Sequence, residues 1–382
     1  ADADLEREPA SAGRMMNGHY STRTLDAEGN WTNLAETRNS SADISPTAGQ
    51  MPRLLGLALA SKFYRNNPEL KDHNTFSNGG NDVAFGTTGD ASTSEGPFWE
   101  AMNAAGVLQV PLVMSVWDDG HGISVPKEFQ TVKQSISEAL SGFQRTEDAP
   151  GFEIIKTKGW DYPHLILTYE KAVKIAREEQ VPVLVHVEEV TQPQGHSTSG
   201  SHERYKSEER LQWEKDFDPI KKMREWIEAN GIASNEELEV LEKSAKKDAR
   251  DAKNNAWKAF LNPMKDDKAA VIQLLTGLAG ASKNAAFINK VKEGLESEAD
   301  SLRKEIIEAA RKGLRYAREE QSPAKAALSQ WIQDKMTENA ERYSSHLYSE
   351  STDSPLKVEP VPADFSDDKK VDGREIIREN FD

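Results

Sequence analysis

Asp90 and Asp119 are the residues of this sequence whose type and position are best suited to holding a metal ion. Asp90 lies in a Gly-Asp turn that ends one apolar segment and precedes small residues, and Asp119 ends a second apolar segment. Main-chain N–H groups in such a loop, at the start of a helix, favour phosphate. A carboxylate beside a phosphate is repelled unless a cation such as Mg²⁺ lies between them. A Gly-Asp pair alone is typical of a tight turn, so the metal hypothesis depends on the two aspartates meeting.

Alternating strand and helix patterns would bring the two aspartates together. Residues 83–88 and 110–117 are predicted strands, and residues 96–108 between them have the apolar spacing of a helix. Farther along, residues 168–180 are a predicted helix and residues 181–190 a predicted buried strand. Strand–helix–strand units form parallel sheets, whose ligands bind at the carboxyl ends of the strands. Both aspartates are therefore expected at the same edge of one sheet.

Changes in composition divide the chain into three parts. Residues 1–206 combine Gly, Ser and Thr with short apolar runs, and residues 207–345 are rich in Ala, Lys and Glu. Residues 346–382 begin as a linker. The predicted fold class is α/β, a parallel sheet flanked by helices and followed by an all-helical segment. One amphipathic stripe in that segment predicts packing on its own domain or on a partner: Leu295, Leu302, Ile306, Ala309, Leu314 and Ala317.

Charge and cysteine content exclude several classes of protein. The 48 basic and 64 acidic residues give a net charge of −16, which opposes binding to nucleic acid and to anionic membrane surfaces. The longest apolar run, residues 104–117, is too short to span a bilayer, and the acidic N-terminal residues do not form a secretory signal. The absence of cysteine excludes disulfides and thiolate sites and fits a cytoplasmic protein.

The motifs around the two aspartates resemble the thiamine diphosphate and magnesium motif of a known family. The first element is Gly89-Asp90-Ala91, and the second is Asp118-Asp119-Gly120-His121. The match is most similar to the alpha subunit of the decarboxylating component of 2-oxo-acid dehydrogenases, of the branched-chain and pyruvate type. It extends over roughly residues 13–260, and further pieces agree in order: residues 13–20, 45–52, 195–205 and 213–231. The resemblance implies a thiamine diphosphate-binding fold for residues 1–206, with its N-terminal part incomplete.

The resemblance implies how the cofactor would be held. Asp90 and Asp119 would bind Mg²⁺ through their side chains, and His121 through its main-chain carbonyl. Ala91 and Ser92 would offer main-chain N–H groups to the diphosphate. The implied cofactors are therefore thiamine diphosphate and magnesium.

Four other positions receive roles from the same resemblance. Ser45 and Thr47 would line the cofactor, and Ile123 would lie near its thiazolium end. His196 would lie beside the reacting carbon as a proton donor or acceptor. A lone loop histidine is ordinarily without such a role, and the Gly-His-Ser-Thr-Ser setting favours the catalytic interpretation.

The sequence departs from the family pattern at the metal motif. Ala91 replaces a Gly, and Asp118-Asp119 replace an Asn pair. The added carboxylate could strengthen the metal site or weaken cofactor binding, and Asp118 itself suits a solvated or hydrogen-bonded loop residue. The family also has about a hundred residues before the counterpart of Gly13, and residues 371–381 resemble the opening helix of a beta subunit. We therefore expect a fragment of a fused alpha–beta protein.

The expected function is decarboxylation of a 2-oxo acid and transfer of the acyl group to a lipoyl arm. Branched-chain substrates are favoured over pyruvate, and the fragment is expected to be inactive alone. The implied partners are a beta-type half and a lipoyl acyltransferase, in a homo-oligomeric assembly. The alternatives are a non-catalytic assembly module with a decayed cofactor site and a transketolase-like enzyme of another reaction type.

Overall fold

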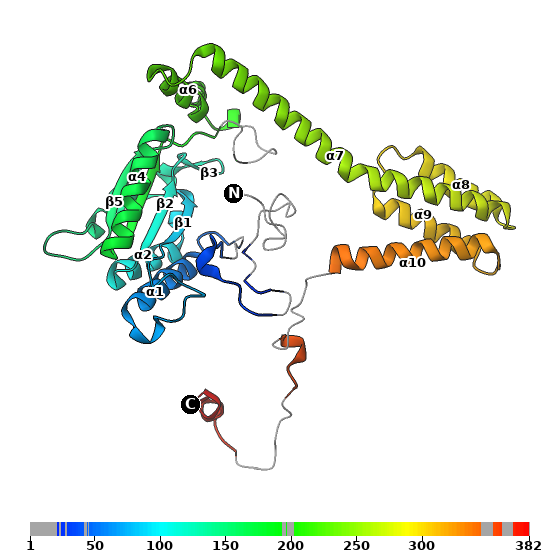
Figure 1. Ribbon diagram of the computed structural model, residues 1–382, viewed down its shortest axis with the longest axis horizontal. Helices are drawn as coiled ribbons and strands as arrows, with labels where there is room; N and C mark the ends of the chain where they lie inside the picture. The colour runs from blue at the N-terminus through cyan, green and yellow to red at the C-terminus, as the bar shows by residue number, and fades with distance from the viewer. Residues whose placement is uncertain are drawn as a thin grey trace. The chain divides into compact units, whose positions relative to one another are not determined.

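The chain forms two compact units, which Figure 1 shows in a computed structural model. Unit 1 includes Trp31–Lys253, and unit 2 includes Asn254–Asp382 together with the short segment Ala27–Asn30. The described residues are 21–22, 24–26, 29–41, 44, 46–192, 196, 202–344, 354–360 and 370–381. The boundaries predicted at residues 206 and 345 remain predictions.

Unit 1 contains a four-stranded, fully parallel sheet, as predicted. Its strands are β1 (Ala84–Gly89), β2 (Leu112–Trp117), β5 (Glu153–Lys158) and β6 (Val183–Glu188), in the order β1-β2-β6-β5. β2 and β6 fall within predicted strands and β1 ends one residue beyond its predicted strand, whereas β5 was not predicted. Because β5 is an edge strand with one fully buried residue, Thr157, it lacks the continuous apolar run of β2 and β6.

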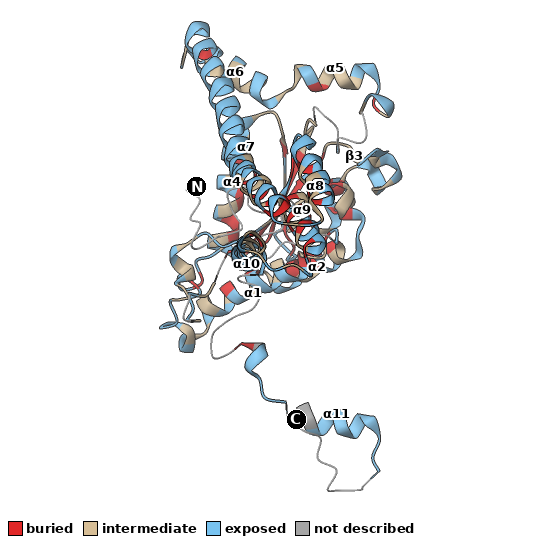
Figure 2. Cartoon of the chain, turned by 90° about the vertical axis from the view of Figure 1, so that its right-hand side faces the viewer, coloured by how far each residue is buried: buried red, intermediate tan, exposed pale blue. Residues whose placement is uncertain are grey.

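Helices cover both faces of the sheet, and this explains the apolar runs of the central strands. On one face α1 (Met51–Asn66) and α2 (Gly96–Leu108) share a core with Leu112, Met114 and Val116 of β2. On the other face α4 (Tyr162–Lys174) and the π-helix η7 (Ile175–Glu179) pack near Val113, Val183 and Val185. Alternate strand residues therefore enter different cores, and buried residues follow the sheet (Figure 2).

Helix α4 begins six residues before the predicted start at residue 168. Its N-cap is Asp161, whose side chain accepts a hydrogen bond from the His164 N–H at 3.1 Å. Pro163 follows within the first turn, where the missing N–H costs nothing. The capping residue marks where the helix begins, and the periodicity of apolar residues does not contain that information.

Short elements connect the strands and follow the sheet. Those between β1 and β5 include residues of the predicted cofactor site. They are η3 (Ala91–Ser94), β3 (His121–Gly122), β4 (Val125–Pro126), η4 (Lys127–Phe129), η5 (Val132–Gln134), α3 (Ile136–Ala139) and η6 (Ser141–Phe143). The others are η1 (Leu34–Glu36), η2 (Pro68–Leu70), η8 (His202–Arg204), α5 (Glu208–Asp216), α6 (Pro219–Ala229), η9 (Pro355–Lys357) and α11 (Gly373–Phe381). β3 and β4 form a short antiparallel hairpin, with two residues in each strand, one residue after Asp118-Asp119.

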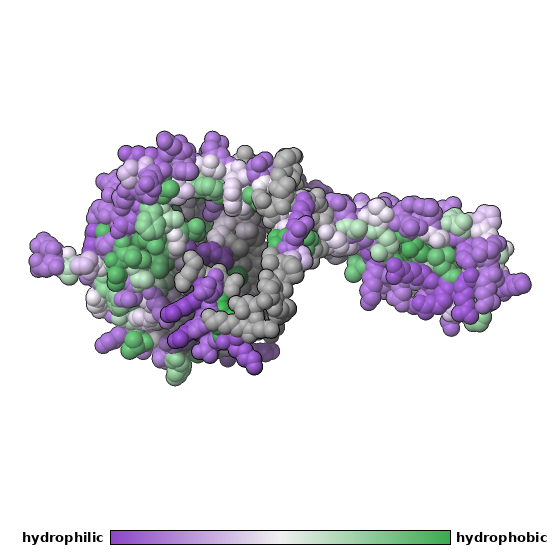
Figure 3. Space-filling view, turned by 90° about the horizontal axis from the view of Figure 1, so that it is seen from below, coloured by the Kyte–Doolittle hydropathy of each residue, from purple (hydrophilic) through white to green (hydrophobic). Residues whose placement is uncertain are grey.

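An all-helical part follows the sheet, as predicted. Its helices are α7 (Asn235–Gly280), whose second half belongs to unit 2, α8 (Ala285–Ser297), α9 (Arg303–Tyr316) and α10 (Pro323–Ser344). Their apolar residues form a separate core that includes Leu275, Ile306 and Leu328. Hydrophilic side chains surround an apolar strip on the surface that Figure 3 shows for this unit. Among the described residues, no helix is both long and apolar enough to cross a membrane.

The predicted amphipathic stripe packs on its own unit, with one correction. Leu295, Ile306, Ala309 and Ala317 are buried in the helical core, and Leu314 packs against it. Leu302 is 45% exposed, because the chain leaves α8 at Ser297 and Leu302 becomes the N-cap of α9 rather than a helical residue. The single predicted helix over this stretch is therefore two helices.

Candidate functional site

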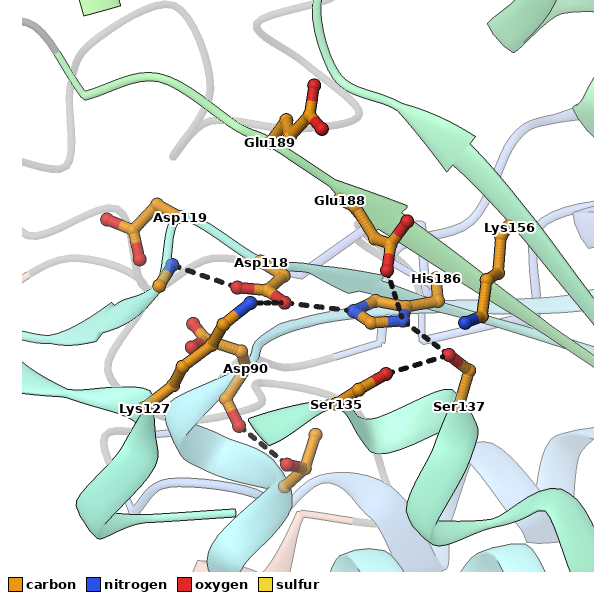
Figure 4. A network of polar contacts seen from close by, with 12 residues as sticks. Asp90, Asp118, Asp119, Lys127, Ser135, Ser137, Lys156, His186, Glu188 and Glu189 are labelled. Atoms are coloured by element: carbon orange, nitrogen blue, oxygen red, sulfur yellow. Dashed lines mark hydrogen bonds and ion pairs between the residues drawn. The ribbon is translucent and has the colours of Figure 1, made fainter. Parts of the chain in front are cut away.

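The register of the sheet brings Asp90 beside Asp118. Gly89 pairs with Trp117 in the parallel ladder, so the next residue of each strand leaves the sheet at the same edge. The Asp90 N–H donates to the Trp117 carbonyl at 3.1 Å, and the Asp118 N–H donates to the Val187 carbonyl at 2.9 Å. The carboxyl ends of β1, β2 and β6 therefore lie at the same edge of the sheet. The side-chain carboxylates of Asp90, Asp118 and Asp119 gather at that edge (Figure 4).

The Asp90 carboxyl is buried, and none of the ion pairs of the described residues involves it. It is 6% exposed, and burial, followed by the charges of Asp118 and Asp119, raises its pKa from 3.8 to about 7. Its carboxylate accepts main-chain hydrogen bonds from Ala91 and from its own N–H, which lower the pKa by less. Thr93 fixes the turn by donating from its N–H and its hydroxyl to the Asp90 carbonyl, at 3.0 and 2.6 Å. A bound cation would relieve this charge.

Asp118 is a hydrogen-bonded carboxylate and is not solvated. It is 3% exposed; its Oδ2 accepts from Lys127 Nζ at 2.9 Å and contacts His186 Nε2 at 3.1 Å. Its Oδ1 accepts from the Gly120 N–H at 2.9 Å. Burial raises the pKa of Asp118, but the hydrogen bonds from His186 and Lys127 outweigh it, so the pKa lies below its usual value.

His186 extends this network into the interior. It lies fully buried on β6, and its Nδ1 is 2.8 Å from the Ser137 hydroxyl, which is itself 3.1 Å from the Ser135 hydroxyl. Its complete burial gives His186 a structural role in this network. A histidine inside an otherwise apolar strand was the available signal, because a buried imidazole needs polar partners.

Asp119 is held by its own loop and by α5. Its Oδ1 accepts from the His121 N–H at 3.1 Å, and its carbonyl accepts from Arg210 at 2.9 Å. The Arg210 guanidinium also donates to Glu214 Oε1 at 3.0 Å and stacks 4.5 Å above the Trp213 ring. Sequence analysis missed Arg210, because nothing in the local sequence joins it to a loop 91 residues earlier.

The β3–β4 hairpin after Asp119 contains His121 and Ile123, whose surroundings differ. The His121 ring packs 5.6 Å from the Tyr205 ring. Ile123 is 60% exposed and has φ = 58°, a left-handed conformation that is rare for a β-branched residue. Such strain is concentrated at functional sites, where the surrounding structure imposes it.

Two predicted cofactor residues line a large cavity in unit 1. The cavity has a volume of about 1080 Å³ and lies along α1 and β1, with Thr47, Thr88 and Ser92 in its lining. Asp90, Ala91, Asp119, His121 and Ile123 are not among the lining residues. Thr47 and Ser92 therefore line one cavity, whereas the carboxylates lie at the carboxyl edge of the sheet and do not line it.

Two predicted site residues remain, Ser45 and His196. Ser45 lies outside the described residues. His196 is exposed, and the residues on either side of it are also outside the described part of the chain. The catalytic role of His196 therefore remains a prediction.

The described residues fit a magnesium–diphosphate group in donor type and charge. Within the described ranges no three His, Asp or Glu side chains are arranged to hold a metal ion by themselves. Mg²⁺ commonly takes only one or two carboxylates and completes its shell with phosphate oxygens and water. In this part of the chain, the ion pairs include Lys127 with Asp118 but none with Asp90 or Asp119. Among the described residues, the two predicted ligands thus have no cationic side chain paired with their carboxyl groups.

Comparison with known proteins gives a family match. The family described as "Dehydrogenase E1 component" matches residues 10–264. Similar proteins include 2-oxoisovalerate dehydrogenase subunit alpha 1 of Arabidopsis thaliana, 28% identical over 66% of this chain and 46% of the relative. The 2-oxoisovalerate dehydrogenase subunit alpha of Bacillus subtilis is 26% identical over 60% and 59%. The pyruvate dehydrogenase E1 component subunit alpha of Rickettsia bellii is 25% identical over 53% and 55%. The chain spans about half the length of the curated relatives it matches.

Proposed function

This chain belongs to the dehydrogenase E1 component family, and we propose that it forms the alpha portion of a thiamine diphosphate-dependent 2-oxo-acid dehydrogenase. The observation that carries the proposal is the carboxylate cluster at the edge of the sheet. There the burial of Asp90 and the nearby charges of Asp118 and Asp119 raise the Asp90 pKa to about 7. Such a cluster of carboxylates is costly unless a cation occupies it.

The chain's own residues would bind and orient the cofactor. The Asp90 and Asp119 side chains and the His121 carbonyl would hold Mg²⁺. Main-chain N–H groups of Ala91 and Ser92 would face the diphosphate. Thiamine diphosphate, when bound, supplies the stabilisation of the carbanion that decarboxylation requires, and the protein supplies position and electrostatics.

Three side chains would act around the reacting end. Thr47 would contact the cofactor from the cavity wall, and the exposed Ile123 would support its thiazolium end. The imidazole of His196 would give or take a proton at the reacting carbon. Its exposed position is compatible with reaching a substrate.

The substrate and partners belong to the same proposal. Branched-chain 2-oxo acids are proposed ahead of pyruvate, and alpha subunits of both 2-oxoisovalerate and pyruvate dehydrogenases are among the similar proteins. A beta-type half would complete the site, and a lipoyl acyltransferase would accept the acyl group. We further propose a homo-oligomeric, cytoplasmic enzyme.

Calorimetry of the intact protein with thiamine diphosphate tests this function. We expect saturable binding that requires Mg²⁺, and Asp90→Asn should weaken it about tenfold or more because the carboxylate charge beside the cation is lost. Asp148→Asn, in an exposed loop, is the matched control. Absence of saturable binding would favour the non-catalytic assembly module. Binding without reduction of NAD⁺ by the complete complex would favour a transketolase-like reaction.

A further inference from the structure

We propose that Lys127 is a positioning residue that neutralises Asp118, so that the site presents two carboxylates rather than three to the diphosphate. This inference rests on the proposed function. It concerns the departure from the family pattern at residues 118 and 119, where two aspartates stand in place of an amide pair.

The contacts of Asp118 show where its charge is balanced. Lys127 Nζ lies 2.9 Å from Asp118 Oδ2, while the carboxylate is 3% exposed and the lysine side chain 36% exposed. The same oxygen contacts His186 Nε2 at 3.1 Å, and Glu188 lies 3.9 Å from the other imidazole nitrogen. Among the described residues, Lys127 thus supplies the ammonium group that pairs with Asp118.

The β3–β4 hairpin fixes Lys127 in this position. Asp118 Oδ1 accepts from the Gly120 N–H, and the Gly120 carbonyl in turn accepts from the Lys127 N–H at 3.0 Å. His121 pairs with Pro126 across the hairpin, which returns the chain to the loop it left. The two residues are therefore connected through main-chain hydrogen bonds to Gly120 as well as by the contact between their side chains, which Figure 4 shows.

The charge of Asp118 should affect the binding of the cation and the binding of the diphosphate in opposite directions. An unbalanced third carboxylate would attract a divalent cation and repel a diphosphate. With Lys127 in place, Asp118 contributes little net charge, and Asp90 and Asp119 are left to face the cation. Loss of Lys127 should therefore strengthen the binding of a free cation and weaken the binding of the diphosphate.

Two binding measurements on the intact protein test this proposal. Mn²⁺, which prefers similar oxygen ligands to Mg²⁺, is titrated alone by electron paramagnetic resonance, and thiamine diphosphate is titrated calorimetrically at saturating Mn²⁺. In Lys127→Met we expect Mn²⁺ to bind about tenfold more tightly and thiamine diphosphate about tenfold more weakly. Asp118→Asn should shift both affinities in the opposite directions. The double variant should return both to within about threefold of wild type.

The control is Lys156→Met, which removes the exposed ion pair with Glu138 and should change neither affinity. If Lys127→Met lowers both affinities together, or the double variant shows no recovery, Lys127 has only a structural role and the proposal is overturned. If the wild-type protein binds no thiamine diphosphate, the proposed function fails. The Mn²⁺ affinities then still decide whether Lys127 offsets the charge of Asp118.

Discussion

At the scale of single residues, Asp90 illustrates a conflict between stability and ligand binding. The residue is 6% exposed and lies near two other carboxylates, and its neighbours supply hydrogen bonds rather than a counter-charge. Keeping it ionised therefore destabilises the folded apoprotein. The same uncompensated charge is what a divalent cation would bind.

The raised pKa predicts a specific dependence of apoprotein stability on pH. With a pKa of about 7 in the folded state and 3.8 as the model value, the folded state binds more protons between these two pH values. The contribution of Asp90 to the unfolding free energy therefore falls as pH rises from about 4 to about 7. Asp90→Asn should remove this loss, stabilising the apoprotein at pH 8 by at most about 4 kcal/mol and hardly at all near pH 4.

Urea unfolding with a chelator present, at pH 5 and pH 8, measures this effect. Asp148→Asn serves as the control because it removes an exposed carboxylate. Equal stability changes of Asp90→Asn at both pH values would contradict the pKa assignment. A loss of stability at pH 8 would indicate that the ionised carboxylate is needed by the fold.

At the scale of elements, the loop that carries Asp119 is held from two sides. The β3–β4 hairpin supplies the His121 N–H to its carboxylate, and α5 supplies Arg210 to its carbonyl. Arg210 is itself anchored by Glu214, which is 3% exposed and also pairs with the buried Lys206 at 2.6 Å. Helix α5 thus positions a loop that is distant in the sequence.

Arg210→Met should therefore affect binding more than folding. The variant keeps apolar contact with Trp213 but loses the hydrogen bond to the Asp119 carbonyl, and groups that orient a metal site cost about tenfold in affinity when lost. We expect the Mn²⁺ affinity, measured by titration, to fall about tenfold. The unfolding free energy should change by about 1 kcal/mol. Arg224→Met, which breaks surface ion pairs of α6, is the control. Unchanged Mn²⁺ affinity in Arg210→Met would argue against the positioning role.

At the scale of the whole molecule, the two units have separate cores. The sheet of unit 1 is covered by two clusters, one including Met102 and Met114 and the other Val185, whereas the helices of unit 2 enclose Leu275 and Leu328. Residues 10–264 match the family, so most of the helical core lies beyond the matched region. Cofactor binding and helical packing are therefore expected to be energetically separate.

A core substitution in unit 2 tests that separation. Leu275 is fully buried, and Leu275→Ala should lower the stability of the helical unit by about 2–5 kcal/mol through lost contacts and a cavity. Scanning calorimetry should show the transition of unit 2 shifted down, with thiamine diphosphate affinity unchanged. Met102→Ala, in the core of unit 1, should shift the other transition. A common shift of both transitions by either variant would mean that the units unfold together.

The sequence alone was enough to predict the parallel sheet, the helical second part and the motif with its two aspartates. These features depend on local information: apolar runs with strand or helix periodicity, and turn residues directly after a strand. The edge strand β5 was not predicted because Glu153–Lys158 is mostly half-buried and interspersed with charge. The start of α4 was misplaced because the Asp161 cap lies outside the apolar pattern.

Only the tertiary structure decided how the charge at the site is balanced. The partners of Asp118 and Asp119 come from other elements: His186 from β6, Lys127 from the end of a hairpin, and Arg210 from α5. No local spacing links such residues, because their contacts depend on strand register and on the path of the loops. The amino-acid pattern therefore identified the carboxylates, and the fold determined which of them is neutralised and which remains available to a cation.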